Sequence, residues 1–529
     1  MEEKMNIPEL RSVHWISPPD MGGENVSSVM RRYVERLGWN TKSENPAIIF
    51  CGSESQLERA AEAKEKYGVP VAMNFWGWMP ERFRLLEWRV HYQKRIELIH
   101  KVADIIVVPA KSAFQQLCCF GINKMSYIIP PGADIELAHS VRSKQEFKYV
   151  VSVGRLVSHK RFNLVIEALS KISGRIPYIV VGTGPLREEL LKQARECNVQ
   201  LIIEENASDE TKFSLIRNAV CLVAPSEYEG FDMPIIEAAV SGTPVLASNL
   251  PIHFELFDDY PIYFPDAEDL ASLIYQLSTN IEFRKIAAAR ISFLGTQYSA
   301  IVAAAAFSRV LCEMVATWIK NKLWKEYEVA KISTEELYNI EAKIDTALFP
   351  YRLDPTIADF SHRTNFLLNH LTGTKILDAA CSNGVFSVHM AANGFDVTAM
   401  DISDEYLNNA KKLSVKMGLQ DKIKFEKADL EQLYLPDCHF DCVWAGEIIE
   451  HFANPNLLLF QLIRVLKPSG RLIFTVPYGD ACYDPMHQKI FNTENDIRNM
   501  FAEFKNFKLD LIEHTLGSSK NWLGYGTKL

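Results

Sequence analysis

The chain of 529 residues has no excess of positive charge, no paired cysteine motif and no long uncharged apolar run. Its formal net charge is -9 at pH 7, from 57 Lys and Arg against 66 Asp and Glu. A protein with this balance presents no domain-wide basic field that would release counterions from nucleic acid phosphates. We therefore expect no nucleic acid partner.

The ten cysteines form no CxxC pair and stand mostly in apolar runs such as Asn218–Ser226. This distribution is typical of reduced core cysteines in a cytoplasmic protein. The first residues, MEEKMNIPELRS, contain neither the basic nor the apolar segment of a secretory signal. No uncharged apolar run reaches the roughly 18 residues that cross a bilayer. We expect a cytoplasmic location.

Three series of short apolar runs alternate with longer amphipathic stretches, a pattern that predicts parallel strands joined by helices. The predicted strands lie within 13–17, 47–52, 70–76, 104–109 and 125–132, then 149–155, 177–184, 200–205, 221–226 and 244–248, then 375–380, 396–401, 423–429, 440–446, 471–479, 507–515 and 522–529. The length exceeds what one core organises. We predict an α/β chain of three Rossmann-like units.

The predicted boundaries group these units two plus one. Residues 1–140 form a short first domain and 141–320 a second. Because 283–330 is strongly helical, it predicts packing helices and a linker, which we place at 321–355. Residues 356–529 form the third unit.

The segment PSEYEGFDMPIIEAAVSGTPV places Glu229 in a glycine loop and Glu237, after seven intervening residues, in a short helix. Pro234 suits a first helical turn, and Asp232 precedes it as an N-cap, so we predict a helix over 234–241. The helix follows a predicted strand, and its start therefore opens at the carboxyl edge of the sheet, where doubly wound folds bind ligands. Unpaired N–H groups there attract a phosphate.

This segment resembles the family 4 glycosyltransferases of GT-B fold, whose hallmark is Glu, seven residues, Glu. Four more segments resemble the family in order along the chain: 17–38, 129–134, 152–169 and 180–190. The resemblance implies that Arg155 and Lys160 face the diphosphate of a nucleotide-sugar donor, Glu229 the sugar hydroxyls and Glu237 the ribose. The further donor-site residues that it implies are Gly22, Gly23, Gly184, Phe231 and Asp232.

Sugar transfer builds negative charge on the leaving phosphates, which fixed cations and a helix start stabilise. The two glutamates would therefore position the donor instead of acting as the acid and base of a glycosidase. The resemblance further implies retention of anomeric configuration, no obligatory metal and the leaving phosphate as proton acceptor. The alternative is that Glu229 is a solvated loop acid and that Arg155 and Lys160 are surface cations.

The acceptor side stays open, because Asn74 stands where many members of the family have a histidine. An aromatic run follows that position: Phe75, Trp76, Trp78, Phe83, Trp88 and Tyr92. Such a run either stacks on a glycan or lipid carrier, or forms core and interface.

In the third unit, the segment 375–403 predicts a strand, a small-residue turn, a helix and a second strand that ends at Asp401. This topology binds a nucleoside, with a dinucleotide dehydrogenase as the alternative. The segment resembles class I S-adenosylmethionine-dependent methyltransferases, and the resemblance continues through 426–433, 440–452 and 464–479.

This second resemblance implies a site for S-adenosylmethionine. Asp378 and the turn Ser382, Asn383, Gly384 would face its methionine part, Asp401 its ribose and Asp429 its adenine edge. The remaining implied contacts are Ala380, Ile402, Leu430 and Glu447. Ala380 and Ser382 stand where glycine is common in the family, and a Cβ there would crowd the cofactor only slightly.

Methyl transfer to a hydroxyl needs a proton acceptor, which favours a histidine of near-neutral pKa. His451 and His487 are the two candidates, and a structural role in buttressing a helix is the alternative for His451. Transfer to nitrogen would need no base, so the acceptor atom stays open. We predict no metal site, because the segment contains no paired acids.

A fused transferase pair raises the concentration of one product at the other site. We expect a bifunctional enzyme that extends a glycan or lipid-linked glycan and then O-methylates it. The strongly helical segment 283–330, which leads into the linker, contains Trp318, Lys320, Lys322, Trp324 and Lys325. These residues either contact an anionic membrane or form a solvated basic face. The alternatives for the whole chain are one active domain beside a binding or scaffolding module, or nucleic acid hypermodification.

Overall fold

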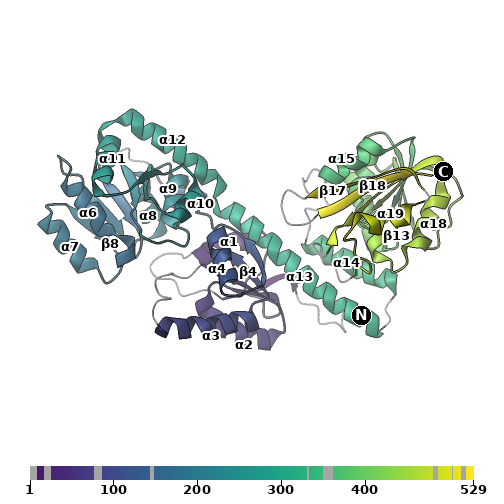
Figure 1. Ribbon diagram of the computed structural model, residues 1–529, viewed down its shortest axis with the longest axis horizontal. Helices are drawn as coiled ribbons and strands as arrows, with labels where there is room; N and C mark the ends of the chain where they lie inside the picture. Colours follow the sequence, from purple (N-terminus) through teal and green to yellow (C-terminus); the bar gives the residue numbers. More distant parts are fainter. Residues whose placement is uncertain are drawn as a thin grey trace. The chain divides into compact units, whose positions relative to one another are not determined.

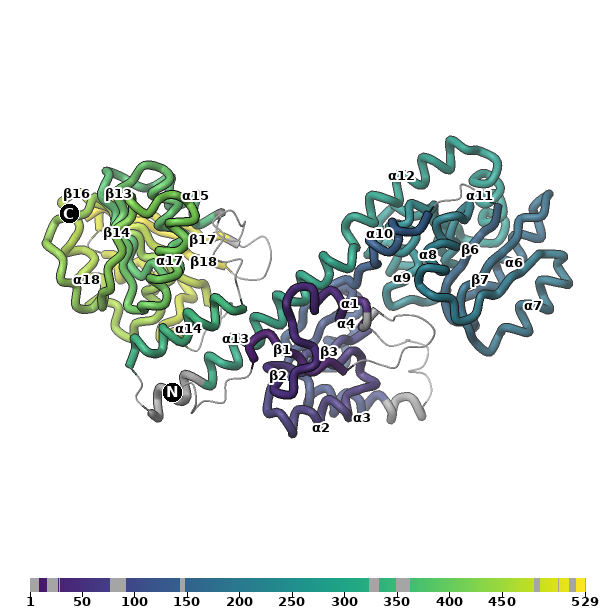
Figure 2. The backbone as a smooth tube through the Cα atoms, turned by 180° about the vertical axis from the view of Figure 1, so that it is seen from behind, coloured from purple at the N-terminus to yellow at the C-terminus, as the bar shows by residue number. Residues whose placement is uncertain are grey.

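The computed structural model describes residues 9–16, 26–76, 86–142, 148–330, 333–348, 361–479, 486–502, 504–513 and 520–528. The chain divides into two compact units, Met1–Leu311 and Cys312–Leu529 (Figure 1, Figure 2). The boundary falls within the long helix α13 (Ala300–Ala330). The three predicted series of strands form three separate sheets, two in the first unit and one in the second. The predicted α/β fold class is confirmed, whereas the exact domain boundaries stay predictions.

The first sheet has five parallel strands in the order β1-β2-β3-β4-β5. Its strands are β1 (Glu9–Ile16), β2 (Pro46–Cys51), β3 (Val71–Asn74), β4 (Ile105–Val108) and β5 (Met125–Ile128), with helices α1 (Val26–Arg36), α2 (Leu57–Tyr67), α3 (Leu86–Val102), α4 (Lys111–Cys119) and α5 (Ile135–Ser140). Every residue of β2 and β4 is buried. A strand covered on both faces is apolar throughout, which is why these segments were recognisable.

The second sheet has six parallel strands in the order β11-β10-β9-β6-β7-β8. Its strands are β6 (Val150–Val153), β7 (Tyr178–Val181), β8 (Leu201–Glu204), β9 (Cys221–Ala224), β10 (Val245–Ser248) and β11 (Ile262–Phe264). Its helices are α6 (Phe162–Ser170), α7 (Arg187–Glu196), α8 (Asp209–Arg217), α9 (Met233–Ser241), α10 (Pro251–Phe257), α11 (Ala267–Thr279) and α12 (Ile281–Gln297). Strand order reverses between β6 and β9, which opens a ligand crevice at their carboxyl ends.

Alternate residues of these strands enter two cores. Leu222 and Val245 pack with α8, α9 and α10 on one face, and Val223 and Leu246 pack with α6 and α11 on the other. This is the two-residue period of a strand buried on both sides. The three-residue strand β11 was not predicted from the sequence.

The third sheet has the order β14-β13-β12-β15-β16-β18-β17, and its pairings are parallel except for those of β18, which is antiparallel to both β16 and β17. Its strands are β12 (Lys375–Ala379), β13 (Asp396–Asp401), β14 (Ile423–Lys427), β15 (Phe440–Gly446), β16 (Leu466–Pro477), β17 (Lys505–Glu513) and β18 (Lys520–Thr527). Its helices are α14 (Thr334–Leu348), α15 (Ser361–His370), α16 (Val385–Ala392), α17 (Asp404–Lys416), α18 (Pro455–Val465) and α19 (Glu494–Arg498). Here the order reverses between β12 and β15.

Helix α14, which falls within the predicted linker, packs on α17 by buried polar contacts. The Tyr406 hydroxyl donates to Asp345 Oδ2 at 2.9 Å, and Asn409 Nδ2 donates to Thr346 Oγ1 at 2.8 Å. The helix is therefore part of the packed second unit.

Helix α13 is apolar and long. Its residues Ala300–Lys322 pass a length and hydropathy test for a membrane span, but 56% of the window is buried within the protein, as in a core helix. Lys320, which the sequence placed on a basic face, is only 13% exposed and pairs with Glu341. Lys322 is exposed and lies over the Trp318 ring at 5.7 Å, whereas the side chains of Trp324 and Lys325 lie outside the described residues.

The described cysteines are all free, in agreement with reduced thiols. The buried ones are Cys51, Cys221, Cys312, Cys381 and Cys442. The expectation of core positions is wrong for Cys118, Cys119 and Cys438, which are exposed.

Candidate active sites

The first site lies where strand order reverses between β6 and β9. The loop after β6 contains Arg155 and the short 3-10 helix that ends at Lys160, and the loop after β9 contains Glu229. Glu227 N donates to His159 O at 2.7 Å, which joins the two loops. The Lys160 ammonium pairs with Glu229, and these side chains are 14% and 10% exposed. Both side chains are therefore held at the crevice, while Arg155 is exposed.

The Glu229 carboxylate is almost completely buried. Burial and the neighbouring Asp232 raise its pKa, while Lys160 and a 2.5 Å hydrogen bond from Ser226 Oγ oppose that rise. A buried carboxylate is stable in its charged form only with such partners. The site thus contains a matched cation and anion.

The glycine turn after β7 packs directly on the loop after β6. A Cβ on Gly182 would lie 2.0 Å from Gly154 O, and one on Gly184 would lie 2.6 Å from Leu156 N. Leu156 N donates to Thr183 O at 2.8 Å. Only glycine permits this backbone approach, so Gly184 sets the position of the loop that contains Arg155.

Asp232 occupies the predicted N-cap position of α9, but its side chain does not cap the helix. Its backbone is left-handed, with φ 72°, and its side chain makes no capping hydrogen bond. The carboxylate lies instead 2.9 Å from Nε2 of the fully buried His253, whose Nδ1 donates to Ser248 O at 2.8 Å. Burial lowers the pKa of His253, but the contacts to Asp232 and Ser248 outweigh it and raise that pKa. His253 was missed because its partner is distant in sequence.

Phe231 and Glu237 also have protein partners. The Phe231 ring is buried, with edge contacts to Phe257 and Tyr298 at 6.0 and 5.9 Å between centroids. Glu237 Oε1 lies 2.7 Å from Lys212 Nζ. This ion pair is another contact that the sequence did not reveal.

Lys212 is nearly buried between two acids, because Asp209 Oδ1 lies 2.8 Å from its ammonium and Glu237 holds the other side. Burial lowers its pKa, but the two carboxylates outweigh that effect and raise it. The predicted ribose ligand Glu237 is thus oriented by an ammonium on α8.

On the acceptor side, Gly22, Gly23, Trp78 and Phe83 lie outside the described residues, as does the Trp88 side chain. Phe75 is buried core, and Tyr92 is 6% exposed. Asn74, Phe75 and Trp76 line one cavity with residues of β4 and with Phe307. A Cβ on Gly230 would lie 2.6 Å from Trp76 O, so the Glu229 loop approaches this segment closely.

The second site lies at the carboxyl ends of β12 and β13. Asp401 accepts from Ser382 N and from Ser403 N, both at 2.9 Å, and Asp378 accepts from Ser387 Oγ at 2.5 Å. Burial raises the pKa of Asp378 to about 7 and that of Asp401 to about 6, and the Asp401 charge adds to the shift of Asp378. This site thus contains two buried carboxylates, whereas the first site pairs a carboxylate with an ammonium.

The turn between β12 and α16 is strained. Ala380 and Ser382 have φ of 61° and 48°, and Gly384 has φ of 77°. A Cβ on Gly384 would lie 2.6 Å from the Ala410 Cβ. The expectation that a Cβ at Ala380 and Ser382 matters little considered only crowding of the cofactor. A left-handed backbone at a non-glycine residue also destabilises the fold by about 1 kcal/mol.

Helix α14 supports the same region. Asn339 Oδ1 accepts from Ser403 Oγ at 2.8 Å and from Glu405 N at 3.2 Å. Asn383 Oδ1 accepts from Asn409 Nδ2 at 3.1 Å. The segment assigned to a linker therefore orients the residues that follow Asp401.

The other predicted cofactor residues occupy different settings. Asp429 is exposed and accepts from Glu431 N at 2.9 Å, and Leu430 is buried in the core. Ile402 is half-buried. Glu447, with φ 55°, accepts from Asn521 Nδ2 at 2.8 Å.

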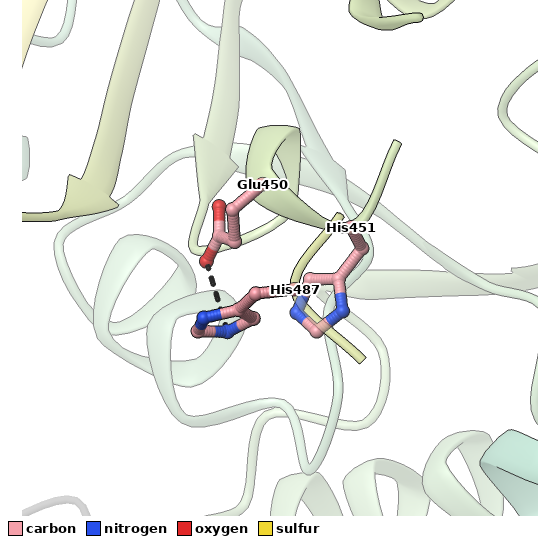
Figure 3. Close-up of side chains that lie close together, drawn as sticks. All are labelled: Glu450, His451 and His487. Carbon is pink, nitrogen blue, oxygen red and sulfur yellow. Dashed lines mark ion pairs between the residues drawn. The ribbon is translucent and has the colours of Figure 1, made fainter. Parts of the chain in front are cut away.

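The two predicted histidines lie together, with Glu450 beside them (Figure 3). His451 and His487 have ring centroids 4.9 Å apart at 85°, and His487 Nε2 lies 3.9 Å from Glu450 Oε1. Gln488 N and Lys489 N donate to Glu450 O at 2.8 and 3.0 Å, which positions the His487 segment. Among the described residues, these three form a group whose ligand atoms all lie within 4.8 Å of one another. Sequence spacing suggested no metal site and did not single out Glu450.

Two family models match this chain: glycosyl transferases group 1 at residues 134–290, and a methyltransferase domain at residues 377–474. The chain thus joins a segment that matches glycosyl transferases group 1 to a segment that matches a methyltransferase domain, and it is called the fusion below. The first match contains the Lys160–Glu229 site, and the second contains Asp378 and Asp401.

Relatives of the methyltransferase half cover a minor part of the fusion chain. It is similar to 27-O-demethylrifamycin SV methyltransferase of Amycolatopsis mediterranei (strain S699), with 39% identity over 101 residues, or 19% of this chain and 37% of that protein. It is also similar to malonyl-[acyl-carrier protein] O-methyltransferase of Erwinia billingiae (strain Eb661), with 33% identity over 112 residues, or 21% and 42% of the two chains. The chain thus spans less than half the length of these relatives.

Among solved structures, Anabaena Alr3699/HepE in complex with UDP has a TM-score of 0.44 and 16% identity, and the match covers 54% of this chain and 81% of that one. At this level of similarity, the fold assignment of the fusion rests on its own sheet orders.

Proposed function

We propose that the fusion is a bifunctional enzyme. Its first unit transfers a sugar from a nucleotide-diphosphate sugar to a glycan or glycolipid acceptor with retention, and its second methylates a sugar hydroxyl with S-adenosylmethionine. The observation that supports this best is the pair of buried charged sites at two sheet reversals, each within one of the two family matches.

In the first unit, the proposed donor is an anion. Arg155 and Lys160 would bind its diphosphate and stabilise the charge that grows there as the bond to the sugar breaks. Glu229, held by Ser226, would accept hydrogen bonds from sugar hydroxyls, and Glu237 from the ribose. The leaving phosphate would take the acceptor proton.

In the second unit, the proposed cofactor is a cation. Asp378 and Asp401 are buried carboxylates with raised pKa values, and positive charge nearby would favour their ionised forms. Asp401 would bind the ribose hydroxyls while Ser382 N and Ser403 N orient it. The Erwinia billingiae relative of this half is an O-methyltransferase by name, which favours oxygen over nitrogen as the acceptor atom.

One substrate can serve both units if a glycan is first extended and then O-methylated, since tethering raises the local concentration of the shared intermediate. We place both reactions in the cytoplasm, with a lipid-linked acceptor at the inner face of the membrane as the natural shared substrate.

The test of sugar transfer is release of nucleoside diphosphate from a panel of nucleotide sugars by the full chain. We expect one donor to react, and Glu229→Gln to slow release by about 100-fold or more. Glu227→Gln is the matched control, because Glu227 is exposed in the same loop. If no donor reacts, sugar transfer is wrong.

The test of methyl transfer is calorimetry with S-adenosylmethionine, followed by mass spectrometry of the glycosylated product for the addition of one methylene mass. Binding that Asp401→Ala abolishes supports the proposal. No binding would instead favour the alternative in which this unit is a scaffolding module.

A further inference from the structure

We infer that Glu450, His451 and His487 form a binding site for a divalent transition-metal ion of the zinc type. The metal site itself stands on geometry alone, and its role in methyl transfer rests on the proposed function. It lies beyond the two donor sites and involves none of their residues.

The positions of the three side chains come from backbone structure. Glu450 and His451 are adjacent in the short 3-10 helix Ile449–His451, which follows the carboxyl end of β15. His487 is brought to them by the two hydrogen bonds that its neighbours donate to Glu450 O. Figure 3 shows the two imidazoles and the carboxylate gathered at one place.

The spacing suits a metal ion better than a direct hydrogen bond. The 3.9 Å between His487 Nε2 and Glu450 Oε1 is too long for a hydrogen bond. Zinc lies about 2.0–2.2 Å from nitrogen and oxygen ligands, so its ligand atoms are roughly 3.3 Å apart in a tetrahedron. The ligand atoms here lie within 4.8 Å of one another, so modest rotamer changes would close them around an ion.

The chemistry of the ligands selects the class of metal. Two neutral imidazoles and one carboxylate are typical of zinc and of other first-row divalent ions, whereas magnesium and calcium prefer oxygen ligands alone. Glu450 is 1% exposed, and a bound cation would compensate the cost of burying its charge. Three protein ligands leave a coordination position open, as in catalytic zinc sites.

The location indicates a role. Strand β15 neighbours β12, so the metal site and the Asp378 turn lie at the carboxyl edge of the same sheet. An acceptor hydroxyl on the open position would lose its proton to solvent water more readily. Its oxygen would then take the methyl group from the sulfonium, as the O–C bond forms, the S–C bond breaks and sulfur keeps the electron pair as a neutral thioether.

The experiment is a titration of the full chain, stripped with a chelator and desalted, with Co²⁺. Visible absorption reports coordination by nitrogen and oxygen. We expect one equivalent to bind, Zn²⁺ to displace it, and a large excess of Mg²⁺ to leave it in place. We expect Glu450→Gln, His451→Gln and His487→Gln each to weaken Co²⁺ binding by at least about tenfold. Loss of a residue that only hydrogen-bonds to a metal ligand already weakens metal binding by about that factor.

His439→Gln is the matched control. His439 precedes β15 and lies at the opposite end of that strand from Glu450, so its loss should leave Co²⁺ affinity unchanged. Cysteine-bound cobalt gives intense charge-transfer bands in the near ultraviolet, which separates any thiolate site. Far-ultraviolet circular dichroism of each variant establishes that it is folded.

The inference is wrong if the stripped chain gives no visible cobalt bands, or if folded variants at all three positions bind Co²⁺ as the natural chain does. Calorimetry with S-adenosylmethionine separates the two proposals. Cobalt bands without S-adenosylmethionine binding would support the metal site and contradict the proposed methyl transfer. Binding of S-adenosylmethionine without cobalt bands would support the proposed methyl transfer and contradict the metal site.

Discussion

The two predicted donor sites of this chain lie at the same kind of strand-order reversal but differ in their electrostatics. In the second sheet, the reversal between β6 and β9 holds an ammonium against a carboxylate, Lys160 against Glu229. In the third sheet, the reversal between β12 and β15 presents Asp378 and Asp401, both carboxylates with raised pKa values. The first site contains an ammonium that an anionic donor could contact, whereas the second contains buried carboxylates alone, which suit a cationic cofactor; the presence of a buried cation therefore distinguishes two sites of shared topology.

The largest effect should come from removing the cation of the first site. Lys160→Met leaves the buried Glu229 without its ammonium, and we expect sugar transfer to fall about 100- to 1,000-fold. The variant should also be less stable, because an unpaired buried charge is costly. Donor turnover and thermal unfolding measure the two effects.

Lys171→Met, at an exposed ion pair after α6, is the control for Lys160. Methyl transfer should be unchanged in both variants. If Lys160→Met retains full sugar transfer, the electrostatic contrast between the two sites has no functional meaning.

The second effect concerns the carboxylates of the methyltransferase. Asp401→Asn keeps the shape but removes the charge, and we expect S-adenosylmethionine to bind about 10- to 100-fold more weakly, as for loss of a hydrogen bond to a charged group. Asp396→Asn, at the exposed start of the same strand, should bind normally. Calorimetry measures both. If the two variants bind S-adenosylmethionine with equal affinity, Asp401 does not contribute to cofactor binding.

The pH dependence of stability in the second unit follows from its two buried carboxylates. Asp378 and Asp401 hold protons in the folded state that the unfolded chain releases near pH 4, since their pKa values are about 7 and about 6. Their contribution to the free energy of unfolding is therefore fully present below pH 4 and is lost as pH rises through 6 and 7.

The difference between the natural chain and Asp378→Asn isolates this contribution. We expect thermal unfolding of the cofactor-free natural chain to lose stability relative to the variant between pH 4 and pH 7. A constant difference across that range would show that Asp378 does not titrate there.

The smallest effect should come from the strained turn. Ala380→Gly relieves a left-handed backbone with φ 61°, and we expect the unit to gain about 1 kcal/mol. Ala379→Gly changes the adjacent buried residue of β12, and we expect it to lower the free energy of unfolding by about 0.5–1 kcal/mol. Denaturant unfolding followed by a probe in the second unit checks the pair. A loss of stability in Ala380→Gly would contradict the strain.

Strands such as β9 and β10 were predictable because each is buried on both faces and lacks charged residues along its length. The three-residue strand β11 is too short for such a signal. The residues Asp378, Asp401 and Glu229 were found because they lie at or after the carboxyl ends of strands, where doubly wound folds bind ligands, and because the family resemblances imply their roles.

The partners of these residues were not predictable, since they depend on which distant segments meet. Lys212 contacts Glu237 from another helix, and His253 contacts the carboxylate of Asp232. His487 lies beside Glu450 because its neighbours donate hydrogen bonds to Glu450 O. A single sequence records the identity of such residues but not their proximity. The prediction that the Asp232 side chain caps α9 was wrong for this reason.

The packing of α14 decides where this polypeptide can be divided. Truncation at the predicted boundary before 356 would delete Asp345, and the buried Tyr406 hydroxyl would lose the acceptor that it donates to at 2.9 Å. It would also delete Asn339, which supports the segment after Asp401. A separately produced second unit should therefore begin upstream of Thr334, so that it includes α14.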